Sequence, residues 1–125
     1  MKWMLCFAVI AATIACNSNN NNSTVTAQMP ASEIANGEAL FKANCASCHK
    51  TVEPYVGPAL KGVANRWPSK ALLYEFVRNS QEVISRNDYA KKLYMEYKES
   101  PMLPFPQLTD ADIDAILKYC DTYNP

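Results

Sequence analysis

The sequence has 125 residues, which is enough for one domain with one core and excludes a second catalytic domain. Twelve lysines and arginines balance twelve aspartates and glutamates. This balance argues against a polybasic surface for nucleic acid or an anionic membrane, so partner selection must depend on local patches.

The N-terminal segment, residues 1–15, carries Lys2 followed by a mostly apolar run, which predicts a secretory signal peptide rather than a spanning helix. We therefore expect the protein to be exported to the periplasm. The residues that end in Cys16 resemble a bacterial lipoprotein signal, although the usual leucine three positions earlier is absent. That resemblance implies lipidation of Cys16 and a lipid anchor on the periplasmic side of the membrane. Ordinary cleavage nearby is the alternative.

The segment 16–31 is rich in asparagine and serine and predicts a flexible tether, because it offers no apolar surface to bury. The remaining residues, 32–125, show helical periodicity without strand alternation or repeats, which predicts an all-α domain. We expect helices over about 32–44, 68–79 and 87–98, and a last helix that starts at Thr109.

The first and last predicted helices each have one apolar face. The first contains Gly37, which lowers helix propensity and therefore indicates a close packing partner. In the last helix, Thr109 and Asp112 have the spacing of a capping box. Its inner face comprises Ile113, Ile116, Leu117 and Cys120.

The segment Cys45-Ala46-Ser47-Cys48-His49 bears the chemistry of the chain. Two thiols at this spacing can each add to a vinyl group of one haem, and the adjacent imidazole then lies under the iron. A redox dithiol would need strand-helix-strand surroundings, and a structural zinc site would need a second ligand pair. The sequence therefore predicts one covalent haem c, bound through Cys45 and Cys48 and ligated by His49.

From residue 36 onwards the chain resembles the class I cytochromes c. In that family a glycine and an aromatic residue precede the first haem cysteine by eight and four positions, where this chain has Gly37 and Phe41. The resemblance implies the cytochrome c fold, in which crossing N- and C-terminal helices and additional helices surround one haem. Ile116 and Tyr119 would be the partners of Gly37 and Phe41.

The stretch from Gly57 to Val63 resembles the family segment in which a proline carbonyl accepts a hydrogen bond from the ligating histidine. The resemblance implies that Pro58 fixes the orientation and basicity of His49. A simple glycine-proline turn is the alternative.

The sixth iron ligand cannot be a second histidine, because His49 is the only one. Methionine, lysine or an open position remain. Met95 and Met102 lie outside the signal and tether, and Met95 falls on a predicted helix where packing is the commoner role. In the family the axial methionine occupies the proline-stiffened loop that contains Met102 here, although Leu103 stands where a proline often follows. The resemblance thus implies Met102.

Three further features carry weaker expectations. Trp67 and Arg66 have donors suited to haem propionates, or belong to an ordinary loop. Cys120 is expected to be a small buried apolar group, with a disulfide-linked dimer as the alternative. The insert at about 80–99 contains a helix, and its lysines, Lys91, Lys92 and Lys98, suggest a docking surface.

These expectations describe a single-electron carrier without catalytic residues. Its partners would be redox proteins, namely a quinol-oxidising complex as donor and a terminal oxidase or reductase as acceptor, with the membrane reached through the lipid anchor and no nucleic acid. Two alternatives stay open. One is an open-site haem protein that binds small molecules or reduces peroxide, and the other is a fixed subunit of a larger oxidoreductase complex.

Overall fold

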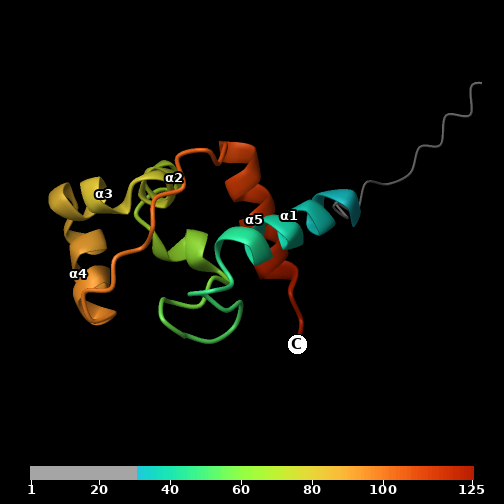
Figure 1. Ribbon diagram of the computed structural model, residues 1–125, viewed down its shortest axis with the longest axis horizontal. Helices are drawn as coiled ribbons and strands as arrows, with labels where there is room; N and C mark the ends of the chain where they lie inside the picture. Colours follow the sequence, from blue (N-terminus) through green and yellow to red (C-terminus); the bar gives the residue numbers. More distant parts are fainter. Residues whose placement is uncertain (1–30) are drawn as a thin grey trace, which may run out of the picture.

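The computed structural model describes residues 31–125, and this part of the chain is all-α. The signal peptide, Cys16 and nearly all of the predicted tether lie outside the described residues. The described part contains five α-helices and one short 3-10 helix (Figure 1): α1 Ala31–Asn44, η1 Val63–Arg66, α2 Lys70–Arg78, α3 Ser80–Arg86, α4 Asp88–Glu96 and α5 Asp110–Thr122. No helix among these residues is long and apolar enough to cross a membrane.

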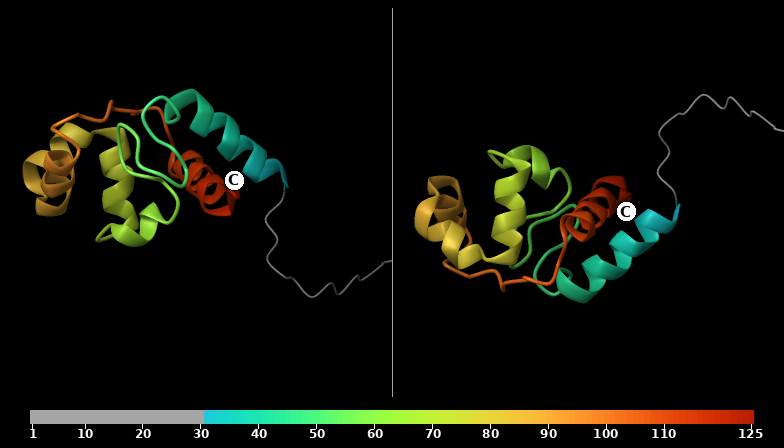
Figure 2. Two further views of the ribbon diagram at one scale, coloured as in Figure 1. Left: turned by 90° about the horizontal axis from the view of Figure 1, so that it is seen from below. Right: turned by 90° about the horizontal axis from the view of Figure 1, so that it is seen from above.

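Helices α1 and α5 pack side by side, although they stand at opposite ends of the domain sequence (Figures 1 and 2). A β-carbon at Gly37 would lie 2.1 Å from the backbone oxygen of Ala115 and 3.0 Å from the Tyr119 β-carbon. Only glycine permits this approach. The Phe41 and Tyr119 rings are 5.6 Å apart. Tyr119 is therefore the partner of Phe41, as expected. Gly37 contacts the backbone of Ala115, whereas Ile116, its expected partner, lines the cavity described below.

The ends of the predicted helices follow local signals. The side chain of Ser69 caps α2, as the Pro68-Ser69 start predicted, and Thr109 with Asp112 forms the predicted capping box of α5. The residues predicted for the inner face of α5 are all buried.

The insert after α2 holds two helices instead of the single predicted one. Asn79 both ends α2, through its backbone N–H to the Glu75 carbonyl, and caps α3 through its side chain. The chain therefore turns between helices without a proline or glycine to mark the break. Helix α4 runs over Asp88–Glu96, slightly shorter than predicted. The helices α2, α3 and α4 pack in succession (Figure 2). Side chains of α2 also bond to α5, with Tyr74 donating to Asp114 and Arg78 pairing with Asp110.

Candidate functional site

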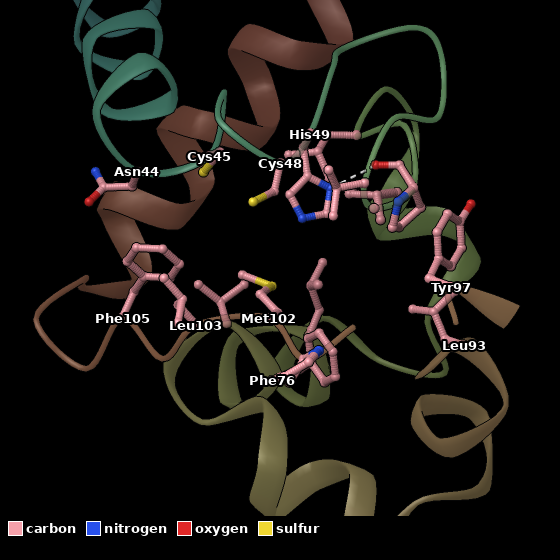
Figure 3. Close-up of a pocket in the computed structure, with 18 of the residues that line it drawn as sticks. Asn44, Cys45, Cys48, His49, Phe76, Leu93, Tyr97, Met102, Leu103 and Phe105 are labelled. Carbon is pink, nitrogen blue, oxygen red and sulfur yellow. Dashed lines mark hydrogen bonds between the residues drawn. The ribbon is translucent and has the colours of Figure 1, made fainter. Parts of the chain in front are cut away.

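A cavity lies between the loop that follows α1 and the segment that joins α4 to α5 (Figure 3). Its walls are mostly apolar, with Leu73, Phe76, Ile113 and Leu117 among them. Cofactor sites are concave and lined mainly by apolar side chains, with a few polar groups that fix the orientation of the ligand, so the lining of this cavity suits a large apolar group.

The motif that follows α1 supplies one wall. Cys45, Cys48 and His49 all line the cavity, and Figure 3 shows both sulfur atoms and the imidazole on the same side of it. Burial raises the pKa of the Cys45 thiol to about 11, which keeps this thiol protonated near neutral pH. Cys48 is exposed, and the two cysteines are free thiols. Thus the two attachment sites predicted from the sequence face one space.

The orientation of His49 is fixed from two sides. Its Nδ1 lies 2.8 Å from the Pro58 carbonyl oxygen, so the structure contains the hydrogen bond that the resemblance implies. Because a carbonyl can only accept, the proton sits on Nδ1, and the lone pair remains on Nε2, which points into the cavity (Figure 3). Burial lowers the pKa of the imidazole and favours this neutral form.

Gly57 supports the other side of the ring, a contact that the sequence analysis did not single out. A β-carbon there would lie 2.4 Å from Cε1 of His49 and 2.8 Å from Nδ1. The backbone N–H of Gly57 also donates to the Cys48 carbonyl at 2.9 Å. Its position directly before Pro58 was the available signal, because glycine often marks close backbone approach.

Met102 lies across the cavity from His49 (Figure 3). Its side chain is half-buried and belongs to the cavity wall. Met95, the other candidate, is 63% exposed and lies outside that wall. Of the two methionines, only Met102 is in a position to face the imidazole.

The hydrogen-bond donors of Arg66 are paired within the protein, whereas the indole donor of Trp67 is not. The two terminal nitrogens of the Arg66 guanidinium donate to backbone carbonyls, one to Ala59 and one to Lys61, so this side chain holds the loop after Pro58. Trp67 lines the cavity, and its Nε1 is the one buried side-chain nitrogen or oxygen without a partner in residues 31–125. A buried donor without a partner costs free energy, so a bound group that accepts a hydrogen bond from Nε1 would recover this cost.

The cavity therefore fits the predicted haem. It offers two thiols at one edge, an imidazole whose free nitrogen faces a thioether sulfur, apolar walls, and an unpaired indole donor suited to a propionate. Among residues 31–125 no three histidine, cysteine, aspartate or glutamate side chains gather in a group that could hold a metal ion. Cys120 is fully buried in the core, as expected for a small apolar group.

Comparisons with known proteins agree with this geometry. A cytochrome c from Rhodothermus marinus is 31% identical, with a TM-score of 0.62 over 74% of this chain and 78% of that one. An engineered cytochrome c from the same organism, Rma TDE, is 30% identical, with a TM-score of 0.59 over 78% of this chain and 82% of that one. The same engineered protein bound to a carbene intermediate gives 30% identity and a TM-score of 0.58, over 78% and 81%.

No curated protein matches the chain at a significant level. The family model described as cytochrome c matches residues 34–123. This match spans the two cysteines, the histidine, the methionine segment, most of α1 and all of α5. The chain belongs to the cytochrome c family, and this membership implies a covalently bound haem c and haem-based electron transfer.

Proposed function

We propose that the protein carries single electrons with one haem c attached through Cys45 and Cys48, and that His49 and Met102 are the axial ligands of its iron. The observation that carries this proposal is the placement of Nε2 of His49 and the side chain of Met102 on opposite walls of one cavity. When bound, the haem supplies a one-electron ferric and ferrous couple. The chain's contribution is to fix both ligands and exclude water.

Each ligand is held through a different kind of contact. The Pro58 carbonyl accepts the Nδ1 proton of His49, which keeps Nε2 basic and aimed into the cavity. Met102 supplies a soft sulfur, which favours the ferrous state and raises the reduction potential. With both positions filled, no site for a substrate remains at the iron, so we expect electron transfer without catalytic residues.

The mouth of the cavity is the surface that we propose for docking of redox partners. Val56 and Leu103 line the cavity and are also 43% and 69% exposed. Tyr55 is 60% exposed and borders an adjoining hollow together with Lys98. An apolar rim flanked by the charges of Glu96 and Lys98 suits brief contact with a quinol-oxidising complex and with a terminal oxidase or reductase.

The lysines of the insert allow a test of this docking surface. Lys98 borders the hollow at the mouth, whereas Lys91 lies on α4 and is exposed. Neutralising Lys98 with glutamine should change the association rate with a redox partner at low salt more than Lys91→Gln does. Equal effects, or no effect from either substitution, would argue against the mouth as the docking surface.

The location of the protein remains a proposal as well. We propose that export and lipidation of Cys16 hold the domain at the periplasmic face of a bacterial membrane. Cys16→Ser should release the haem protein from the membrane fraction while its spectrum stays unchanged. If the wild-type protein is already in the soluble periplasmic fraction, it is not anchored through Cys16.

An optical spectrum tests the ligation. The protein would be matured in a host that attaches haem and examined oxidised, reduced and with carbon monoxide. We expect a low-spin haem with the near-red band of sulfur-to-ferric-iron ligation and no binding of carbon monoxide. Met102→Ala should abolish the band and admit carbon monoxide, whereas the matched variant Met95→Ala should keep the wild-type spectrum. A wild-type protein that binds carbon monoxide readily would indicate an open-site haem protein instead.

A further inference from the structure

The segment between α4 and α5, residues 98–108, contains Met102 and is here called the Met102 loop. It has no helix of its own, so its backbone groups depend on neighbours. Three of its backbone groups bond to one short junction, Val77–Ser80, where α2 ends and α3 begins. Phe105 donates its N–H to the Val77 carbonyl at 3.1 Å, and Arg78 Nε donates to the Leu108 carbonyl at 2.9 Å.

The third bond is made at Met102 itself. The Ser80 hydroxyl donates to the carbonyl oxygen of Met102 at 2.6 Å, across 22 positions of the sequence. Ser80 is 1% exposed and is the first residue of α3. Because the hydroxyl is shielded from water, the bond lies in a low-dielectric setting, where a hydrogen bond is stronger than at the surface.

The entry to the Met102 loop is under backbone strain. Lys98 and Glu99 have φ angles of 57° and 55°, in the left-handed region that side-chain-bearing residues rarely adopt. Two consecutive strained residues favour any rearrangement that relaxes them. The loop therefore needs restraint downstream, and the bond from Ser80 supplies it at the residue that faces the iron site.

We propose that Ser80 is a positioning residue for the axial methionine: its buried hydroxyl holds the Met102 backbone so that an external ligand does not displace the sulfur from iron. The proposal rests on the proposed ligation by Met102. On this proposal helix α3 positions the Ser80 hydroxyl, because Ser80 is the first residue of that helix.

The test compares two serines of the same helix. Ser80→Ala removes the bond to Met102, and Ser85→Ala removes a local bond to the Glu82 carbonyl on an exposed face. Imidazole is titrated into each ferric holoprotein while the near-red band is followed. We expect Ser80→Ala to bind imidazole about fivefold to tenfold more tightly than the wild type, the factor that one lost buried hydrogen bond produces. The Ser85→Ala variant should match the wild type.

Further variants keep the outcome decisive. Ser80→Thr retains the hydroxyl and should restore weak imidazole binding. If the alanine variant does not accumulate as holoprotein, Ser80→Cys keeps the volume with a weaker donor and should raise the imidazole affinity about twofold to threefold.

If the near-red band is present in the wild type but Ser80→Ala, or Ser80→Cys in its place, binds imidazole no more tightly than Ser85→Ala, the role of Ser80 is overturned. The ligation by Met102 would then still stand. A wild-type protein without that band would overturn the ligation by Met102, and the role of Ser80 with it.

Discussion

The α1 and α5 pair and the Met102 loop are held together by different means. The helices meet along a face, with Gly37 against the Ala115 backbone and Phe41 against Tyr119. The loop is attached at a few points, chiefly the bonds from Val77, Arg78 and Ser80. A close-packed face cannot move without losing many contacts at once, whereas a loop held by single bonds can shift locally. Substitutions in the pair should therefore change folding, and substitutions around the loop should change ligation.

The largest expected effect is on the helix pair. Gly37→Ala would place a methyl group 2.1 Å from a backbone oxygen, which only a shift of α1 or α5 can relieve. We expect a loss of about 3 kcal/mol in the free energy of unfolding, after the small gain in helix propensity. Denaturant unfolding of the holoprotein measures it.

The matched control for Gly37→Ala is Asn36→Ala, on the exposed side of the same helix. It should change the free energy of unfolding by no more than about 0.5 kcal/mol. The folded fraction of Gly37→Ala should retain the near-red band, because its defect lies away from the ligands. Equal stability of the two variants would mean that the helices are not in such close approach.

The next effect concerns the histidine side of the cavity. Gly57→Ala would bring a methyl group within 2.4 Å of Cε1 of His49, so the ring or its loop must move. We expect a loss of about 2 kcal/mol in the free energy of unfolding, together with a shifted reduction potential. Gly62→Ala is the comparison. The φ of 68° at Gly62 would strain an alanine backbone, but the added β-carbon would lie no closer than 3.8 Å to any neighbouring atom.

The Gly62→Ala variant should lose roughly 1 kcal/mol of stability from backbone strain, with an unchanged potential. Redox titration and urea unfolding of both variants separate the two effects. If Gly57→Ala keeps the wild-type potential, contact with the imidazole is not what requires glycine at that position.

The smallest effect is an acid dependence at the start of α5, where the Met102 loop joins the helix pair. Hydrogen bonds from the side chain and backbone of Thr109 lower the pKa of Asp112. For Asp114, burial acts to raise the pKa, but hydrogen bonds from Lys70 and Tyr74 and the charges of Lys70 and Lys118 outweigh it, and the pKa is lowered. A lowered folded pKa stabilises the protein above the ordinary carboxyl value of about 3.9, and this stabilisation is lost as the pH falls below it.

We therefore expect the urea midpoint of the wild type to decrease as the pH is lowered from 5 to 3, because these two carboxyls, among others, become protonated. The double variant Asp112→Asn and Asp114→Asn should have a lower midpoint at pH 5 and a shallower decline. Circular dichroism at the two pH values provides the measurement. Parallel declines in both proteins would exclude these two carboxyls as contributors.

Much of the fold was predictable because its signals are local. The starts of α2 and α5 are set by Ser69 and Thr109, whose side chains cap the helices that follow them directly. Helix α3 was missed, because Asn79 ends one helix and starts the next without a proline or glycine. The end of α2 near Asn79 was predicted, but the seven residues of α3 are too few to show a clear helical periodicity in the sequence.

The sequence by itself determined the haem attachment segment, since the spacing of Cys45, Cys48 and His49 is fixed by adjacent covalent bonds. It also indicated the packing of the terminal helices through Gly37. It favoured Met102 over Met95 through the family resemblance, and the structure places Met102 in the cavity wall. Only the tertiary structure decided that the Trp67 donor is unpaired while the Arg66 donors are used, and that Ser80 holds the Met102 carbonyl. These contacts join residues far apart in the chain, and their distances depend on how the helices pack, which no local spacing records.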